Sequence, residues 1–358
     1  MSAPNTSFSF SNGLHVPNRY MLAPLTNLQS HDDGSLSEAE LHWLTMRAKG
    51  GFGIVMTCAT SVMASGKGFK GQLGLYDDHH IAGHRKLCQA IHDNGAVIFT
   101  QLHHAGMRSP KELIQHTPVC PSDDMETGAR AVSISEIHDI RDSFIQAAHR
   151  AQQAGYNGAE IHAAHGYLLC QFLSKQYNRR TDQYGGSMEN RFRLIEEILQ
   201  GIHDICGEKF TVGIRFSPER FGMEIDEVVE WAQYCVDKKL VHFIDFSLWD
   251  IRKEVTLSDG SSVSLLDKCL SIQKGNVCIT VAGKIQTAQD VCTTLQTNVD
   301  FVSIGRSGIL HHDFPQKIAD NANFCPQELP VSPEYLQQQG LSGDFIQYMK
   351  NWPGFVSA

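Results

Sequence analysis

The feature that most constrains the fold of this chain is an alternation of short apolar segments with segments of helical periodicity. Eight such pairs follow one another, which indicates a parallel sheet covered by helices and enough units to close a (β/α)8 barrel. The expected strands are residues 20–23, 53–59, 97–102, 158–163, 211–216, 243–247, 277–282 and 301–305. The expected helices are residues 38–49, 81–94, 135–154, 188–205, 225–238, 264–274, 287–295 and 314–321.

An open, doubly wound sheet is the main alternative, and it would carry a glycine-rich turn after its first strand. Here the first strand runs into Pro24-Leu25-Thr26, so the closed barrel is favoured. Asn12-Gly13 lies between two short alternating runs and predicts an N-terminal β-hairpin. No linker or repeat interrupts the pattern, and we expect one domain over residues 1–358.

Two segments lie outside this alternation. The loop over about 103–134 follows the third strand, and loops of that length in a compact domain usually have a function. Because it begins at the end of a strand, we expect it to form a lid over the active face. The extension over about 326–358 contains Tyr348, Trp352 and Phe355. We expect this extension to pack within its own chain, with contact to a second subunit as the alternative.

Composition excludes several classes of partner. The net charge of -9 at pH 7 disfavours nucleic acid, which is bound by basic surfaces. No apolar stretch approaches the roughly 20 residues of a membrane helix, and the N-terminus carries no signal-peptide pattern. The ten cysteines form no C-x-x-C pair, so we expect neither structural zinc nor an iron–sulfur cluster. These features predict a cytoplasmic protein with reduced cysteines.

Polar side chains gather at the end of the fourth expected strand. His162, His165 and Tyr167 lie at or just after the end of the apolar run over 158–163, and barrels place their chemistry at the carboxyl ends of strands. Neutral imidazoles and a phenol can each donate a hydrogen bond. The cluster therefore predicts a site that holds a reacting oxygen, or else two of the ligands of a metal ion.

The last two expected strands each end in glycine and a basic residue, as Gly283-Lys284 and Gly305-Arg306. The loops after the seventh and eighth strands form the usual phosphate site of these barrels. Glycine lets the backbone N–H groups approach the oxygens, and a guanidinium can clamp them. The pair predicts a phosphate-bearing ligand, and tight turns with solvated charges are the alternative.

Two further polar residues lie on expected strands. Alternation places Arg215 on one face of the fifth strand, and a charge buried inside the barrel needs an anionic or polar partner. That partner would be a ligand that gains negative charge on reduction, or a carboxylate such as Asp245. Gln101 ends the third strand and offers both a donor and an acceptor, which suits the edge of an imide.

Together these motifs resemble the Old Yellow Enzyme family of FMN-dependent oxidoreductases. The resemblance extends from about Phe8 to His311, and the joint presence of D-x-Y-G-G-S and H-x-x-H-G-Y makes it highly specific. The segments that carry it are Ala23-Pro24-Leu25-Thr26, Gln101-Leu102-His103-His104-Ala105-Gly106, His162-Ala163-Ala164-His165-Gly166-Tyr167-Leu168-Leu169, Asn178-Arg179-Arg180-Thr181-Asp182-Gln183-Tyr184-Gly185-Gly186-Ser187 with Asn190-Arg191, and Gly305-Arg306.

The resemblance implies a barrel that binds FMN tightly and without a covalent bond. NADPH or NADH would reduce the flavin, which would pass a hydride to the β-carbon of an α,β-unsaturated carbonyl or nitro compound. By position, His162 and His165 would hold the substrate oxygen and Tyr167 would protonate the α-carbon. The residues that the resemblance assigns to FMN are Pro24, Leu25, Thr26, Ala59, Gln101, Arg215, Gly283, Lys284, Gly305 and Arg306.

Three positions depart from patterns within that family. Thr26 stands where one branch carries cysteine, so tuning of the flavin by sulfur is not expected. Lys284 stands where glycine is frequent, so its side chain would contact the phosphate or face solvent. His165 stands where other branches carry asparagine, which would alter substrate preference or pH response. The absence of clustered cysteines disfavours the dienoyl-CoA reduction and amine demethylation of the longer iron–sulfur members.

Two other functions remain open from the residues alone. A metal-dependent hydrolase would use His162 and His165 with Glu160, but it leaves the phosphate-type turns without a role. A non-catalytic barrel would keep the fold, but it has no need of Tyr167. The expected partners are an electrophilic alkene and a nicotinamide cofactor, without nucleic acid or membrane, and the sequence leaves monomer and homo-oligomer equally open.

Overall fold

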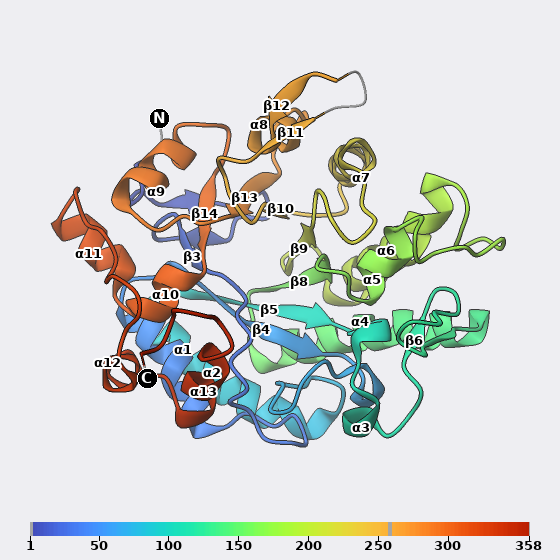
Figure 1. Ribbon diagram of the computed structural model, residues 1–358, viewed down its shortest axis with the longest axis horizontal. Coiled ribbons are helices and arrows are strands. Elements are labelled where there is room, and N and C mark those ends of the chain that lie inside the picture. The colour runs from blue at the N-terminus through green and yellow to red at the C-terminus, as the bar shows by residue number, and fades with distance from the viewer. Residues whose placement is uncertain (1–2, 257–259, 358) are drawn as a thin grey trace.

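The computed structural model describes residues 3–256 and 260–357, so residues 1, 2, 257–259 and 358 of the expected domain lie outside it. Its centre is a closed barrel of parallel strands with helices on the outside, which confirms the predicted fold (Figure 1). In order around the barrel the strands are β3 (Tyr20–Leu22), β4 (Ile54–Ser61), β5 (Val97–His103), β8 (Gly158–Ala163), β9 (Thr211–Phe216), β10 (Phe243–Ser247), β13 (Cys278–Ala282) and β14 (Phe301–Ile304).

The predicted helices form the outer layer, and most begin or end within two residues of the expected bounds. The exception is the helix expected over 264–274, which was too long: α8 ends at Cys269, and turns around Gly275 lead into β13. The helices of this layer are α1 (Glu38–Lys49), α2 (Ile81–His92), α4 (Ile134–Ala154), α6 (Met188–Cys206), α7 (Ile225–Asp237), α8 (Leu265–Cys269), α9 (Ala288–Leu295) and α11 (Phe314–Asp320).

Several short elements lie between these units, and none is long enough to show a periodic pattern in the sequence. Two of them follow barrel strands at the predicted site, α5 (Leu168–Leu173) after β8 and α10 (Arg306–Leu310) after β14. Further short elements are the 3₁₀ turns η1 (Ala64–Gly66), η2 (Asp78–His80) and η3 (Gly106–Arg108), the helix α3 (Lys111–Ile114), and the antiparallel pair of β11 (Glu254–Thr256) with β12 (Ser262–Ser264).

The predicted N-terminal hairpin is present and closes one end of the barrel. Its strands, β1 (Phe8–Ser9) and β2 (His15–Val16), pair antiparallel. The ring of Phe10 lies 5.8 Å from those of Phe99, Phe243 and Phe301, near the amino ends of three barrel strands. Each buried phenylalanine contributes about 1.5–3 kcal/mol of hydrophobic free energy. The hairpin therefore fills the amino end with side chains and leaves ligand chemistry to the carboxyl end.

The expected lid lies between β5 and α4, so its bounds are 104–133 rather than 103–134. It contains η3, α3 and the short strands β6 (Val119–Cys120) and β7 (Arg130–Ala131). The loop is tethered to the segment after β8, because Nη1 of Arg180 donates hydrogen bonds to the carbonyl oxygens of Val132 at 2.6 Å and Pro121 at 2.9 Å. Met125, near the tip of the loop, is 95% exposed.

The C-terminal extension packs beside α1 through α12 (Pro333–Gln338) and α13 (Gly343–Met349), as Figure 1 shows. The rings of Trp43 on α1 and Phe345 on α13 are 5.3 Å apart and edge-to-face. A backbone bridge between Val331 and Val356 ties the two ends of the extension together. Among the residues described, no helix has both the length and the apolar character needed to cross a membrane.

Candidate functional site

The carboxyl ends of the barrel strands gather all of the residues that were predicted to bind ligand. This follows from the parallel topology, which puts the last residue of every strand at the same rim. Pro24, Leu25 and Thr26 follow β3; Ala59 lies on β4; Gln101 on β5; His162 on β8, with His165 and Tyr167 just after it; Arg215 on β9; Gly283 and Lys284 after β13; Gly305 and Arg306 after β14.

The two predicted histidines and the tyrosine form one cluster. The rings of His162 and His165 are 5.1 Å apart, and the ring of Tyr167 is 5.2 Å from that of His162. His165 has a φ of 60°, a conformation that is uncommon outside glycine and is found at functional sites. The turn is held by a hydrogen bond from the backbone N–H of His165 to Oγ of Ser217 at 2.9 Å.

Both imidazoles are neutral at ordinary pH. Burial is the main cause that places the pKa of each well below the usual range, and the positive charges of Arg215 and Arg108 act in the same direction. Nδ1 of His162 has no hydrogen-bond partner among the described residues. A neutral imidazole has one N–H donor and one acceptor, so the cluster can stabilise negative charge on a ligand oxygen without itself carrying a charge.

Ser247, at the end of β10, is a site residue that sequence analysis missed. Its Oγ lies 2.7 Å from Nε2 of His165 and accepts a longer hydrogen bond of 3.5 Å from Nη2 of Arg215. The serine thereby joins the histidine to the arginine across three neighbouring strands. A serine at the end of an apolar strand is too common to signal this role, because its partner His165 is 82 residues away.

Arg215 lies in a buried group of charges inside the barrel. Its Nε is 3.1 Å from Oδ2 of Asp245, the carboxylate anticipated as its alternative partner. The contact has ion-pair distance without hydrogen-bond geometry, and Nε of Arg215 and both oxygens of Asp245 make no hydrogen bond among the described residues. Burial raises the pKa of Asp245 and of nearby Glu160, while Arg215 opposes the rise in both. The arginine therefore still has hydrogen-bonding capacity for a ligand.

Gln101 is placed to meet the edge of a planar ligand. Its Nε2 donates to Oε1 of Glu160 at 2.6 Å, which turns Oε1 of the amide away from the carboxylate. No hydrogen bond to that amide oxygen is present in the part of the chain that is described. Gln101 and Glu160 are also register partners on β5 and β8. The amide oxygen is available to accept from an imide N–H, as a flavin would offer.

The turns after β13 and β14 differ in what they leave open. A Cβ on Gly305 would meet nothing nearer than Leu25 at 3.9 Å, so open space remains beside the backbone there. A Cβ on Gly283 would lie 3.0 Å from the backbone nitrogen of Ile251, so this glycine is needed for packing. Arg306 is exposed, and Nζ of Lys284 is engaged by Asp250 at 2.9 Å. The open backbone at Gly305 and the exposed guanidinium of Arg306 fit a phosphate.

Two further residues missed by the sequence analysis surround Tyr167. The guanidinium of Arg108, in η3, lies 4.6 Å from the centre of the Tyr167 ring and donates to the carbonyl oxygen of His165 at 2.5 Å. Tyr348 of α13 reaches the same region from the C-terminal extension. Burial raises the pKa of Tyr348, the charge of Tyr167 adds to the rise, and a hydrogen bond with Thr26 opposes it. The chain's own C-terminal helix thus contacts its own site.

The most specific sequence motif, D-x-Y-G-G-S, has a structural role. Oδ1 of Asp182 accepts from the backbone N–H of Tyr184 at 3.0 Å, and Ser187 caps α6 through the N–H of Asn190. A Cβ on Gly185 would lie 2.4 Å from the carbonyl oxygen of Arg180. The motif shapes the loop that tethers the segment after β5, and it supplies no group to the cluster around His162.

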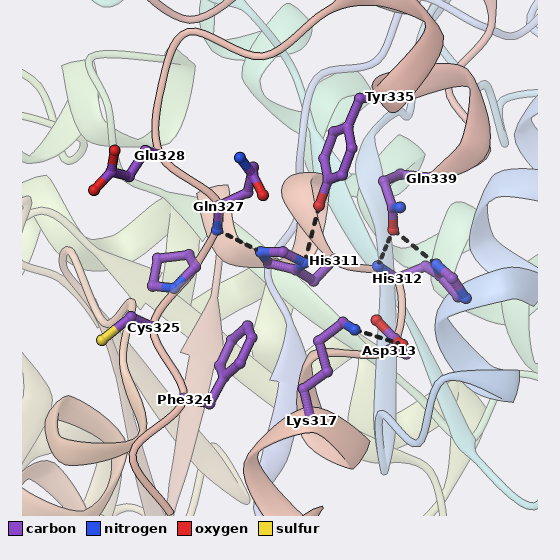
Figure 2. A pocket seen from close by; sticks show the side chains of 11 residues that line it. His311, His312, Asp313, Lys317, Phe324, Cys325, Gln327, Glu328, Tyr335 and Gln339 are labelled. Atoms are coloured by element: carbon purple, nitrogen blue, oxygen red, sulfur yellow. Dashed lines mark hydrogen bonds and ion pairs between the residues drawn. The ribbon is translucent and has the colours of Figure 1, made fainter. Parts of the chain in front are cut away.

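A separate cavity of about 530 Å³ lies beside α11 and α12, away from the predicted residues. Figure 2 shows that most of its polar groups are engaged with one another, while the side chain of Glu328 points away from them. Nε2 of His311 accepts from the backbone N–H of Gln327 at 2.9 Å, and Nδ1 lies 3.1 Å from the hydroxyl of Tyr335. Lys317 pairs with Asp313 at 3.3 Å.

The described residues also include no group of three His, Cys, Asp or Glu side chains arranged to hold a metal.

Comparison with known proteins agrees with this site. The sequence profile of the NADH:flavin oxidoreductase / NADH oxidase family matches residues 8–324. A probable NADH-dependent flavin oxidoreductase of Bacillus subtilis is 34% identical over 325 residues, covering 87% of each chain. An NADPH dehydrogenase of Bacillus velezensis is 30% identical over 325 residues, covering 89% of this chain and 94% of its own.

Solved structures extend the likeness to three dimensions. The old yellow enzyme homologue from Zymomonas mobilis aligns with a TM-score of 0.80 and 26% identity, over 93% of this chain and 96% of its own. Morphinone reductase aligns with a TM-score of 0.79 and 27% identity, over 94% of this chain and 93% of its own. The match to the family profile covers most of the chain, and the chain belongs to the NADH:flavin oxidoreductase / NADH oxidase family, as an FMN-dependent, NAD(P)H-linked oxidoreductase of the Old Yellow Enzyme type.

Proposed function

We propose that this enzyme reduces the activated C=C bond of α,β-unsaturated carbonyl and nitro compounds, with Tyr167 as the proton donor. The observation that carries the proposal is the cluster of two neutral imidazoles and one phenol, with ring distances of 5.1 and 5.2 Å, at the rim of the barrel. When bound, FMN supplies the hydride chemistry between the nicotinamide and the alkene.

His162 and His165 would hold the carbonyl or nitro oxygen of the substrate. Addition of a hydride to the β-carbon moves negative charge onto that oxygen, and fixed N–H donors stabilise such charge in a site shielded from water. Neutral donors suit this role because they need no counter-charge in the ground state. His162 is 3% exposed, and its Nδ1 makes no hydrogen bond to any described residue, which supports its assignment to the ligand.

Tyr167 would deliver the proton to the α-carbon. Its ring is fixed on one side by the guanidinium of Arg108 at 4.6 Å and meets the ring of His162 at 5.2 Å. A positioned acid typically contributes a factor of 10²–10⁴ to the rate. The hydroxyl oxygen of a phenol can give a proton to a developing carbanion and regain one from water after the product leaves.

The residues proposed to hold FMN lie around the rest of the rim. Gln101 would accept from the imide N–H of the flavin, and Arg215 would face the part of the ring that gains negative charge on reduction. The ring would be lined by Pro24, Leu25, Thr26 and Ala59. The phosphate would be contacted by Gly283, Lys284, Gly305 and Arg306. Three observations support this assignment. The amide of Gln101 is oriented by Glu160, Nε of Arg215 makes no hydrogen bond to any described residue, and the backbone at Gly305 is open.

The proposal is tested with purified protein under anaerobic conditions. The flavin absorbance should bleach on addition of NADPH or NADH and return on addition of 2-cyclohexenone or a nitroalkene, with the saturated product formed in equal amount. Reoxidation by oxygen or quinones without any reoxidation by an activated alkene would contradict the proposed substrate class.

A further inference from the structure

Glu160 is a buried carboxyl group whose role is not covered by the function proposed above. It lies in the middle of β8, two residues before His162, and is fully buried. Gln101 on β5 and Gly213 on β9 are its register partners on the two neighbouring strands. Because Gln101 is the residue proposed to meet the edge of the flavin, Glu160 lies one side chain away from that edge.

The barrel interior around Glu160 holds two carboxyl groups and one cation. Nε of Arg215 on β9 lies 3.1 Å from Oδ2 of Asp245 on β10, and these side chains are 6% and 0% exposed. Glu160 instead faces an uncharged amide, because Nε2 of Gln101 donates to its Oε1 at 2.6 Å. One guanidinium can neutralise one carboxylate, so a second ionised carboxyl group here would be a buried charge without compensation.

The hydrogen bonds of Glu160 favour the neutral acid. Its Oε2 has no hydrogen-bond partner among the described residues. A buried charge is costly unless it is both paired and hydrogen-bonded. Burial is the main cause that raises the pKa of Glu160 well above its usual range. The charge of Asp245 adds to this rise, while Arg215 and the hydrogen bond from Gln101 oppose it. The proton of the two carboxyl groups is therefore on Glu160.

We propose that Glu160 is a neutral acid in the resting enzyme, and that its ionisation in alkali makes reduction of the bound flavin harder. The inference rests on the proposed placement of FMN against Gln101 and Arg215. An ionised Glu160 would add negative charge near the part of the ring that gains negative charge, while Arg215 is already paired with Asp245. Glu160 is thus a positioning residue, which acts through Gln101 and through its own charge.

The coupling between Glu160 and the flavin has a defined sign. Like charges repel strongly in a dry interior, so an ionised Glu160 lowers the midpoint potential of the flavin. By reciprocity, reduction of the flavin raises the pKa of Glu160, and the carboxylate takes up one proton from water between its two pKa values. One proton taken up with two electrons changes the equilibrium constant tenfold per pH unit, which is about 30 mV.

The test compares the midpoint potentials of the FMN-loaded wild type and Glu160→Gln from pH 6 to 9.5. The variant keeps an oxygen that can accept from Gln101 but cannot ionise. The difference between the two potentials should be constant near pH 6, where Glu160 is neutral. In alkali the wild-type potential should fall further, and by pH 9.5 the difference should have changed by about 30 mV, a factor of ten in the equilibrium constant. Glu160→Met replaces the Gln variant if the latter loses the flavin.

Glu227→Gln is the matched control. Glu227 also pairs with a buried arginine, Arg191 at 2.7 Å, but it lies on α7 in the outer layer. The potential of this variant should follow that of the wild type at every pH. A difference between the wild type and Glu160→Gln that does not vary with pH would overturn the inference, because a purely structural role shifts the potential equally throughout. Titration of the flavin itself and of Asp245 is present in both proteins.

Gln101→Leu tests the placement of FMN separately. It should weaken FMN binding, which flavin fluorescence on release measures. Unchanged FMN affinity would contradict the placement and, with it, the inference. Weaker affinity together with a potential difference that does not vary with pH contradicts only the role of Glu160. The potentials are measured without an alkene, so they do not depend on the proposed substrate class.

Discussion

Oγ of Ser247 lies 2.7 Å from Nε2 of His165, and this contact links the end of β10 to the turn after β8. The histidine has a φ of 60°, so its side chain is directed by a backbone conformation that few residues adopt. With Ser247 on one ring nitrogen, the other nitrogen is left for a ligand. The serine thus orients a group that the proposed chemistry needs.

Replacing Ser247 by alanine should weaken the binding of phenols, which mimic the anionic form of the substrate. The loss of one hydrogen bond of about 1 kcal/mol corresponds to roughly a fivefold increase in Kd. Spectral titration of the oxidised enzyme with a phenol measures this Kd. Ser143→Ala, on the exposed face of α4, removes a hydroxyl far from the site and should have no effect. Equal affinity in the two variants would contradict the orienting role of Ser247.

Arg215→Met should destabilise the protein and weaken its hold on FMN. Asp245 is fully buried, and removal of the cation leaves its carboxylate without a compensating charge, at a cost of about 3 kcal/mol. Urea unfolding and FMN release, followed by flavin fluorescence, measure the two effects. Arg215→Lys keeps the positive charge, so it should lose less stability and release less FMN than Arg215→Met. Unchanged stability and FMN retention in Arg215→Met would contradict the role of the ion pair.

Stability should fall in mild acid because of buried histidines. Burial lowers the pKa of His84 and of His104 from 6.5 to about 4. Because the folded-state value lies below the unfolded value, the stabilisation is present above pH 6.5 and is lost as the pH falls toward 4. Each of the two should cost about 1 kcal/mol between pH 7.5 and 5.5. Glu160 and Asp245, whose pKa values burial raises, act in the opposite direction.

A variant isolates the histidine from those carboxyl groups. His84 bonds to the hydroxyl of Tyr156 and the carbonyl oxygen of Gly74, away from the proposed ligand site. In His84→Gln the carboxyl groups still titrate and the imidazole does not. Its free energy of unfolding in urea should fall by about 1 kcal/mol less than that of the wild type between pH 7.5 and 5.5. Identical slopes for the two proteins would show that His84 does not titrate in this way.

Tyr348 should act within its own subunit. Its hydrogen bond with Thr26 and its proximity to Tyr167 place α13 over the site of the same chain. Tyr348→Ala should therefore reduce turnover, and mixing it with inactive Tyr167→Phe subunits should restore none of the loss. Recovery of activity in the mixture, after conditions that allow subunits to exchange, would mean that the helix serves a neighbouring subunit.

The barrel could be predicted because each strand is an apolar run of the right length. β8, β9 and β10 have the expected bounds, and every residue in them is buried, as in strands covered on both faces. The error at α8 arose because apolar residues continue past Cys269 as buried turn residues such as Ile272, without a helix. The short helix α10, with five residues, gave no periodic signal at all.

A candidate site residue such as His162 could be predicted because a sequence motif coincides with the end of a strand. Residues that lie outside such motifs were missed. Ser247, Arg108 and Tyr348 act through partners distant in the sequence, and nothing in their neighbourhoods marks them. Sequence motifs therefore indicated the cluster at the end of β8, and the structure added the residues that contact it.

The most direct test of the account separates the two half-reactions in Tyr167→Phe. Stopped-flow absorbance follows reduction of the flavin by NADPH or NADH and then its reoxidation by 2-cyclohexenone under anaerobic conditions. If Tyr167 donates the proton, reoxidation should slow by a factor of about 10²–10⁴ while reduction changes little. Equal slowing of both half-reactions, or reoxidation at the wild-type rate, would contradict the assignment of Tyr167 as the proton donor.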